Sequence, residues 1–176
     1  GTTAFLNMHP APDRAVLQNG MFLVSSFGRH LGRTNYVGCA GGFDRFEGGW
    51  KPYEGIFTNR SQNRFASVLD GTTNTLLFGE STGGYTFDQN SRFHRREVSF
   101  SWMGAGALPA AWGLAPTPPA TKPSWEQFNS EHSGIVQFAF ADGSVRKISV
   151  RVDRAAFIFV GGMADGQLVD DEALGN

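Results

Sequence analysis

The chain has 176 residues, a net charge of −1, 23 glycines and only 18% charged residues, a composition that fits one domain rich in turns and β structure. Its basic residues are scattered and form no stripe with interleaved aromatic residues, which argues against a nucleic-acid-binding protein. Its apolar runs are far shorter than the roughly 20 residues of a membrane-spanning helix, so we expect no membrane span in this chain.

Residues 1–33 are expected to form an extended N-terminal segment or connector. The dipeptide Asn19-Gly20 predicts a hairpin between residues 15–17 and 21–24, and we favour these two short strands over a single helix. Two prolines, Pro10 and Pro12, make the start extended. Three apolar residues before them are therefore expected to contact a neighbouring copy rather than pack in their own domain: Phe5, Leu6 and Met8.

Short apolar runs separated by glycine-rich turns predict several strands after this segment. Residues 98–103 alternate between apolar and polar side chains, which is typical of a half-buried strand. Residues 104–124 differ, because they hold five prolines and no acidic residue, and they predict a surface loop, with an O-glycosylated loop or a contact arm as alternatives. The strands expected before this loop cover residues 35–40, 55–58, 65–69 and 73–79.

Residues 135–150 predict two strands joined by a tight turn that contains Asp142-Gly143. A two-residue loop would place polar side chains opposite apolar ones, because a shift of one residue reverses the faces of a strand. We therefore expect a three-residue loop over residues 142–144. That loop pairs Phe138 with Ile148.

A short helix and a tail are expected after the hairpin. Asp153 is expected to cap a helix that runs through Phe159 and stops at Gly161-Gly162. The remaining residues, 163–176, are acidic, and we expect them to form a frayed tail. The sequence therefore predicts one mainly β, antiparallel domain over residues 34–162, α+β at most, with long loops rich in glycine and proline.

Nine residues separate His132 from Asp142, and the predicted strand lies between them. A straight strand holds its ends too far apart for the two side chains to form a catalytic pair within the hairpin. Asp142 is therefore interpreted as a turn residue whose carboxylate bonds nearby N–H groups. Glu80 ends an apolar run and needs a partner there, and we expect a buried structural pair between Glu80 and His132. No Gly-x-Ser-x-Gly sequence is present, so we expect no enzyme, and a secreted hydrolase is the least favoured alternative.

No cofactor or metal is expected. The four histidines do not occur at zinc spacings, and the single cysteine, Cys39, excludes a cysteine-rich site and an internal disulfide. Asn59 begins an N-glycosylation acceptor sequence, and Thr117 and Thr121 are the candidate O-glycosylation positions of the Pro-rich loop. The one cluster of acidic residues that calcium would need is interpreted as a solvated tail: Asp165, Asp170, Asp171 and Glu172.

Three motifs occur in an order that resembles one protein family. They are Thr-Asn-Tyr-Val-Gly-Cys-Ala-Gly at residues 34–41, Asp-Gly-Thr-Thr-Asn-Thr-Leu running into Gly-Glu at residues 70–80, and His132 followed after nine residues by Asp-Gly-Ser-Val. Together they resemble a large family of unknown function, abundant in planctomycete bacteria. Its members begin with a prepilin-type cleavage and methylation segment and carry a prepilin-type processing-associated His-x9-Asp-Gly domain. The motif residues here are Asn35, Tyr36, Asp70, Gly71, Asn74, Glu80, His132, Asp142 and Gly143.

This resemblance implies a pilin-like plan, in which a long hydrophobic N-terminal helix precedes a β-rich head outside the cell. The pilin helix is expected to be absent from this chain. Two further departures are Ser-Gly-Ile after His132, where members usually read Pro-Gly-Gly, and the lack of a second cysteine. Pseudopilins with calcium in their C-terminal loop make calcium in the acidic cluster an expectation by analogy.

The expected function is that of a pilin- or pseudopilin-like structural subunit at the cell surface or outside the cell. Copies of the chain would associate through exposed aromatic residues and unpaired strand edges. A secreted carbohydrate- or solute-binding module is the alternative from another class. That module would show a site lined by aromatic residues such as Trp50, Tyr53 or Trp112.

Overall fold

A computed structural model describes residues 4–11, 14–23, 33–43, 48–58, 61–84, 100–101, 106–116, 124 and 126–175. Its strands are β1 (Ala4–Ala11), β2 (Arg14–Leu23), β3 (Arg33–Thr34), β4 (Tyr36–Cys39), β5 (Leu76–Glu80), β6 (Phe100–Ser101), β7 (Ala107–Leu108), β8 (Ile135–Phe140) and β9 (Val145–Ser149). Its helices are α1 (Arg154–Gly161) and the 3-10 turns η2 (Lys51–Tyr53), η3 (Phe65–Ser67), η4 (Thr72–Asn74) and η5 (Ala110–Trp112). Within these described residues no helix is both long and apolar enough to cross a membrane.

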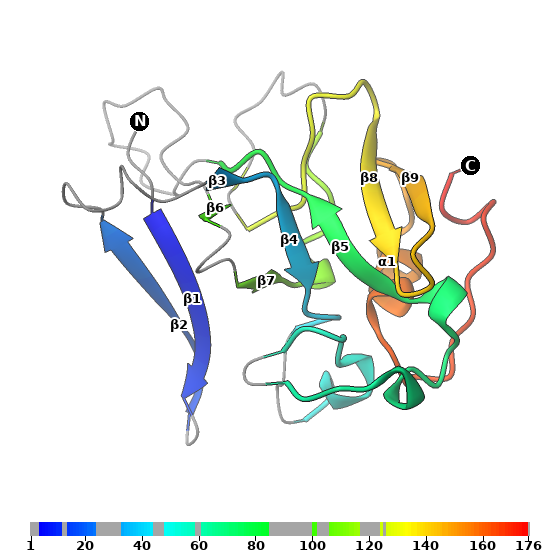
Figure 1. Cartoon of the computed structure of the whole chain (residues 1–176), viewed down its shortest axis with the longest axis horizontal. Coiled ribbons are helices and arrows are strands. Elements are labelled where there is room, and N and C mark those ends of the chain that lie inside the picture. The colour runs from blue at the N-terminus through cyan, green and yellow to red at the C-terminus, as the bar shows by residue number, and fades with distance from the viewer. Residues whose placement is uncertain are drawn as a thin grey trace.

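Five strands form the main sheet in the order β7-β4-β5-β8-β9 (Figure 1). The pairs β4–β5, β5–β8 and β8–β9 are antiparallel, whereas β7 runs parallel to β4. The pairs β1–β2 and β3–β6 form separate two-stranded sheets. The mainly β fold expected from the sequence is therefore confirmed, and the parallel edge strand β7 is an addition to the antiparallel pattern.

The buried core lies on the inner face of the main sheet, where α1 packs behind the strands (Figure 1). Burial alternates along β8, so that Val136, Phe138 and Phe140 are buried between partly exposed neighbours. Phe157 of α1 packs on this face, with its ring centroid 5.5 Å from that of Phe138. Each large apolar side chain buried in this way contributes about 1.5–3 kcal/mol. Other core residues are Val37, Cys39, Leu76, Phe128, Ile148, Val160 and Leu174.

Gly79 of β5 lies directly beneath two of these aromatic rings. A Cβ atom at this position would lie 2.3 Å from Phe138 Cε1 and 2.6 Å from Phe128 Cδ1. Interiors are packed too densely to absorb such overlaps without moving the rings. The edge-to-face pair of Phe128 and Phe138, with centroids 5.1 Å apart, therefore depends on glycine at this position.

The helix α1 begins as the sequence predicts. The carboxylate of Asp153 accepts hydrogen bonds from the backbone N–H groups of Ala155 and Ala156 at 2.8 and 3.1 Å. These bonds satisfy two of the N–H groups that a helix leaves unpaired at its start. The helix continues to Gly161, two residues beyond the predicted end, so its existence and its cap are confirmed.

The β8–β9 hairpin has the predicted loop length but a different register. The N–H of Gly143 donates to the carbonyl of Phe140 at 3.0 Å, and Gly143 has a φ of +84°, a conformation that favours glycine. The three loop residues are therefore 141–143, one position earlier than predicted. Consequently Ile148 pairs with Val136, two residues from the predicted partner. The faces of the strands are unchanged, because a shift of two residues preserves them.

Arg146 of β9 occupies an inward-facing position at the edge of the core. Its guanidinium carbon lies 3.7 Å from the centroid of the Phe140 ring, and its Nη1 lies 3.1 Å from a carboxylate oxygen of Asp171. The other guanidinium nitrogen donates to the carbonyl of Thr73. The charge is thus compensated by an aromatic face, a carboxylate and a carbonyl at once.

The N-terminal strands contradict the hairpin predicted at Asn19-Gly20. β1 pairs with β2 over its length, and the register places Met8 opposite Asn19 and Asn7 opposite Gly20. The dipeptide therefore lies inside β2 and makes no turn, because pairing along a whole strand outweighs a two-residue turn signal. Residues Phe5, Leu6 and Met8 belong to the extended strand β1, which pairs with β2 of the same chain, and their contact with a neighbouring copy stays a prediction.

Two further predicted strands are not strands in the described part of the chain. Residues 55–58 belong to no strand, and residues 65–67 form the turn η3. The hydroxyl of Ser67 accepts from the N–H of Arg64 at 3.2 Å, and the N–H of Leu69 donates to the carbonyl of Met163 at 2.7 Å. The backbone groups of this segment are thus satisfied by turn and tertiary bonds rather than by a sheet.

Two regions predicted to lie outside the core are part of it. Residues 106–116 were expected in a surface loop, yet β7 joins the main sheet and four side chains of this region are buried: Leu108, Ala110, Ala111 and Ala115. The tail was expected to be frayed, yet Leu174 is 1% exposed and its carbonyl accepts from the N–H of Ser149 at 3.0 Å. Both predictions failed because these contacts join residues that are distant in the sequence.

Candidate functional site

Glu80 ends β5 at the edge of the outer sheet face, opposite Tyr36 of β4. Its side chain is 12% exposed. One carboxylate oxygen, Oε2, accepts from the backbone N–H of Gln137 at 2.9 Å, and the other, Oε1, lies 3.5 Å from His132 Nε2. The ladder between β5 and β8 reaches Gly79 and Phe138, so the Glu80 carboxylate continues the strand pairing by one step. Both oxygens of this largely buried acid are therefore engaged.

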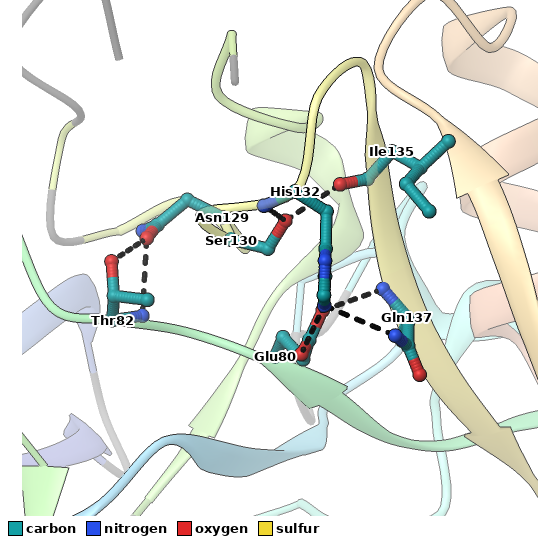
Figure 2. A network of polar contacts seen from close by, with 7 residues as sticks. All are labelled: Glu80, Thr82, Asn129, Ser130, His132, Ile135 and Gln137. Carbon is teal, nitrogen blue, oxygen red and sulfur yellow. Dashed lines mark hydrogen bonds and ion pairs between the residues drawn. The ribbon is translucent and has the colours of Figure 1, made fainter. Parts of the chain in front are cut away.

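His132 lies in the turn before β8 and reaches back over Glu80 (Figure 2). Its Nε2 is also 3.1 Å from the side-chain Nε2 of Gln137. An imidazole nitrogen accepts from an amide N–H when it is unprotonated and donates to a carboxylate when it is protonated. The same atom therefore serves either Gln137 or Glu80. The predicted pair of Glu80 and His132 exists, but the His132 side chain is 49% exposed, so the prediction that both are buried is wrong for the histidine.

Ser130 lies two residues before His132, and its hydroxyl is fully engaged. The residue is 2% exposed. Its Oγ donates to the carbonyl of Ile135 at 2.6 Å and accepts from the N–H of His132 at 3.1 Å. A serine whose proton is held by a backbone carbonyl is not activated by the imidazole as a nucleophile. Its role here is to close the turn that leads into β8.

Asn129 is the most densely bonded side chain of the network, and the sequence interpretation missed it. Its Oδ1 accepts from the N–H and the hydroxyl of Thr82 at 3.0 and 2.5 Å. Its Nδ2 donates to the carbonyls of Gly83 and Gln127, both at 3.0 Å. The residue is 2% exposed, so these bonds satisfy a buried amide completely. The sequence contains only one sign of this role, an asparagine between Phe128 and the His132 motif.

Together these side chains join three separate stretches of chain, residues 80–83, 127–132 and 135–137 (Figure 2). Every polar group described above has a protein partner. Among the residues named above, the arrangement contains an acid and an imidazole, and the hydroxyl of Ser130 is held by a backbone carbonyl. These hydrogen bonds hold the end of β5 against β8 and against the turn that precedes β8. We refer to Glu80, Thr82, Asn129, Ser130, His132 and Gln137 as the polar network.

The other motif residues lie outside the polar network, although Asn35 and Tyr36 adjoin it. Asp142 and Gly143 form the turn at the opposite end of β8, where Asp142 Oδ1 accepts from the N–H and hydroxyl of Ser144 at 2.8 and 2.7 Å. These bonds lower the pKa of Asp142, with the hydroxyl of Ser144 as the main cause. The carbonyl of Asn35 accepts from the N–H of Ser81 at 2.7 Å, beside the network. Asn35 thereby extends the pairing of β4 with β5.

Asp70 of the second motif ties a turn to the C-terminal segment. It is 8% exposed, and its two oxygens accept from the N–H groups of Asp165 and Gly166 at 2.8 and 2.9 Å. The following Gly71 has a φ of +92°, and the Asn74 side chain donates to the carbonyl of Asp70 at 3.3 Å. The turn predicted at Asp70-Gly71 therefore also fixes a distant part of the chain.

The acidic residues proposed for calcium are dispersed. Asp165 lies beside Asp70, Asp171 binds Arg146, and Asp170 accepts from the N–H of Ala173 at 2.8 Å. Among the residues that the structure describes, no three His, Cys, Asp or Glu side chains converge on a point where a metal could bind. The interpretation of these residues as solvated fits Asp170, Asp171 and Glu172, which are exposed, but it is wrong for Asp165, whose Oδ2 is buried without a hydrogen-bond partner.

Three aromatic residues named for a carbohydrate site do come together. Trp50 and Tyr53 have ring centroids 6.2 Å apart, and Phe43 links Trp50 to Trp112 at 5.5 and 5.3 Å. The candidate glycosylation positions lie outside the described residues: Asn59, Thr117 and Thr121. Cys39 is fully buried, and burial raises the pKa of its thiol to about 12, which makes it unreactive.

Comparison with known proteins gives one family. A family model described as "Protein of unknown function (DUF1559)" matches residues 13–155, well over half of the chain. The matched span runs from the β1–β2 hairpin into α1 and includes the whole polar network. No curated protein and no solved structure matches the chain significantly.

Proposed function

Because the chain belongs to the DUF1559 family, whose function is unknown, we propose a role from its geometry: a non-catalytic structural subunit of an assembly at the cell exterior. The observation that carries this proposal is an apolar row across the outer face of the main sheet. Two side chains of the row, Phe78 and Val145, are exposed to solvent, whereas the inner face carries the buried core. A neighbouring copy of the chain is the partner that would cover it.

The row crosses three adjacent strands in register. Phe78 of β5 pairs with Ala139 of β8, and Ala139 pairs with Val145 of β9. At one end of the row Phe57 packs against Phe78, with ring centroids 4.8 Å apart. Phe57 lies over Gly38 of β4, where a Cβ atom would come within 2.8 Å of its ring. We call these four side chains, Phe57, Phe78, Ala139 and Val145, the outer row.

Exposure distinguishes the outer row from ordinary sheet packing. Val145 is 65% exposed and Phe78 is 39% exposed, and Tyr36 on the adjacent edge of the same face is 56% exposed. An antiparallel sheet commonly presents a polar face to water, so large apolar side chains in register on that face indicate a contact surface. The net charge of −1 leaves little electrostatic repulsion between two copies. These features favour self-association over binding of a strongly charged partner.

The polar network supports a non-catalytic role. Glu80, Ser130 and Asn129 are each held by backbone groups of their own chain. An active site leaves its acid, base or nucleophile directed at a substrate, whereas these groups are directed at the fold. The resemblance of the three motifs to proteins with a prepilin-type N-terminal segment supports a pilin- or pseudopilin-like subunit, located outside the cell or on its surface.

The test is the mass of the protein in solution and its appearance by electron microscopy. Val145→Lys places a charge in the outer row on an exposed side chain, where a strand position tolerates it. We expect the unaltered chain to form dimers or larger assemblies in sedimentation velocity at high concentration. The variant is expected to shift toward the monomer by at least tenfold in the association constant.

Leu168→Lys is the matched control, because Leu168 is 73% exposed but lies in the C-terminal segment outside the main sheet. We expect this control to associate like the unaltered chain. A chain that stays monomeric at every concentration would contradict the proposal. An equal loss of association in both variants would show that the outer row is not the contact surface.

A further inference from the structure

The strand β9 forms one edge of the main sheet, because the strand order runs from β7 to β9 (Figure 1). Two hydrogen bonds that flank its ladder identify the backbone groups that face β8. The N–H of Phe140 donates to the carbonyl of Ser144 at 2.9 Å, and the N–H of Val150 donates to the carbonyl of Gly134 at 3.0 Å. Along an antiparallel strand, residues that bond one neighbour alternate with residues whose groups point the other way. The even-numbered residues of β9 therefore bond β8.

The odd-numbered residues of β9 direct their backbone groups away from β8: Val145, Lys147 and Ser149. The C-terminal segment meets this edge at Ser149, whose N–H donates to the carbonyl of Leu174 at 3.0 Å. Among the residues that the structure describes, the outward N–H and carbonyl groups of Val145 and Lys147 bond no other group. An open edge of this kind accepts a strand from another chain.

Both open positions carry their side chains on the outer face of the sheet. Val145 pairs with Ala139 in the outer row, and Lys147 pairs with Gln137 of the polar network. Val145 is 65% exposed, and Lys147 is exposed as well. Val145 is thus the last side chain of the outer row before the edge. A strand added to β9 would lie directly beside it.

A second copy of β9 is the strand that fits this edge. Two identical strands pair antiparallel about a two-fold axis, so that each copy presents the same surface to the other. With the axis beside Val145, this residue lies opposite its own counterpart, and each N–H donates to the carbonyl of the other copy. The two outer rows then join into one apolar row across both sheets, with the two valine side chains in contact at its centre.

The charges along the edge favour this register. It places Lys147 opposite Gly143 of the second copy, next to the exposed acid Asp142 in the same turn, and the symmetry makes this contact twice. An axis at Arg146 or at Lys147 would instead set two like charges opposite each other, which destabilises a strand pair. The axis at Lys147 would also require the N–H of Ser149, which already bonds Leu174.

We propose that two copies of the chain pair through β9, antiparallel about a two-fold axis at Val145, and so join their main sheets into one continuous sheet. The inference rests on the proposed self-association and names the strand and the register that carry it. Because both copies use the same edge, the pairing closes at a dimer. The joined outer rows of that dimer would be the surface offered to further copies.

Disulfide trapping of two cysteine variants, Val145→Cys and Lys147→Cys, tests the register. Both positions are exposed and lie on the same face of β9. In the proposed pairing the two Val145 Cα atoms are about 5.5 Å apart, which a disulfide can span. The two Lys147 residues are offset by four strand positions, about 13 Å. In oxidised glutathione, we expect Val145→Cys to form linked dimers at least tenfold faster than Lys147→Cys on non-reducing gels. Cys39 does not compete, because it is buried and unreactive.

Amide hydrogen exchange of the unaltered chain tests the main-chain pairing. The N–H groups of Val145 and Lys147 face the second copy in the proposed register. We expect both to exchange at least tenfold more slowly at a protein concentration where the chain is associated than after dilution to the monomer.

The two measurements separate this pairing from the proposed assembly. Equal trapping of the two cysteine variants, or unchanged exchange in an associated chain, would overturn the β9 pairing while the assembly role stands. A chain that stays monomeric but whose Val145→Cys variant is trapped selectively would keep the β9 contact while the assembly role fails.

Discussion

The carboxyl groups of Asp70 and Asp165 lie side by side although 95 residues separate them in the chain. Asp70 uses both oxygens to accept backbone N–H groups of Asp165 and Gly166. Asp165 Oδ1 accepts from the N–H of Gln167 at 2.8 Å, while its Oδ2 is buried without a partner. Burial, followed by the proximity of Asp70, raises the pKa of Asp165 to about 6.

This pair predicts that Asp165→Asn stabilises the protein above pH 6. The folded-state pKa of Asp165, about 6, exceeds the value near 3.9 of an unfolded chain. The folded state therefore binds the proton more tightly, and this contribution to stability is present below about pH 4 and lost as the pH rises through 6. An asparagine amide can donate to Asp70 at every pH.

Thermal unfolding between pH 4 and pH 8 measures the effect. The gain in melting temperature of Asp165→Asn over the unaltered chain should be a few degrees at pH 8 and should shrink toward pH 4. The expected change in melting temperature is small because Asp165 is partly exposed, and solvent screens its charge. A difference that does not change with pH would show that Asp165 titrates normally in the fold.

Asn129 is predicted to matter more for stability than the motif residue His132. Asn129→Ala removes the partners of Thr82, Gly83 and Gln127 in a buried place, which costs about 2–4 kcal/mol. His132→Ala removes a half-exposed side chain and one ion pair, which costs about 1 kcal/mol or less. Urea unfolding curves of the two variants give the comparison. Equal free energies of unfolding would mean that the buried amide is not what holds the polar network together.

Gly79→Ala is predicted to be strongly destabilising for steric reasons alone. The added methyl group would overlap the rings of Phe138 and Phe128, and overpacking of this kind costs about 1–3 kcal/mol or more. Gly49→Ala is the matched control, because no heavy atom lies within 4 Å of the new Cβ there. Melting temperatures of the two variants decide the point. If Gly79→Ala melts like the unaltered chain, the inner face is not packed as described.

Signals that are local in the sequence predicted local structure well. The hairpin β8–β9 and the helix α1 follow from alternating apolar residues, from the turn at Asp142-Gly143 and from the cap Asp153. The pair of Glu80 and His132 was also predicted, because a carboxylate at the end of an apolar strand requires a partner. Only the exposure of the histidine differed.

Structure that depends on distant contacts was not predictable in this way. The turn predicted at Asn19-Gly20 does not form, because this dipeptide pairs with β1 instead. Leu108 and its neighbours in the proline-rich stretch are part of the core, because β7 pairs in parallel with β4. Asn129 bonds residues 46 and 47 positions away. A single sequence carries no local sign of such partners. The contact between Trp50, Tyr53 and Trp112 through Phe43 was predictable in part. The residue types suggested a shared site, but only the fold shows that the rings come together.

The position of β8 within the sheet affects the order in which parts of the protein fold during synthesis. β8 lies between β5 and β9, and three rings of the core that includes Val37 and Leu76 come from β8 and α1, near the C-terminal end of the chain: Phe138, Phe140 and Phe157. A chain being synthesised has therefore released β4 and β5 long before these rings can pack on them. Such strands stay open to other partners until the last hairpin arrives, a period in which contacts between chains compete with folding.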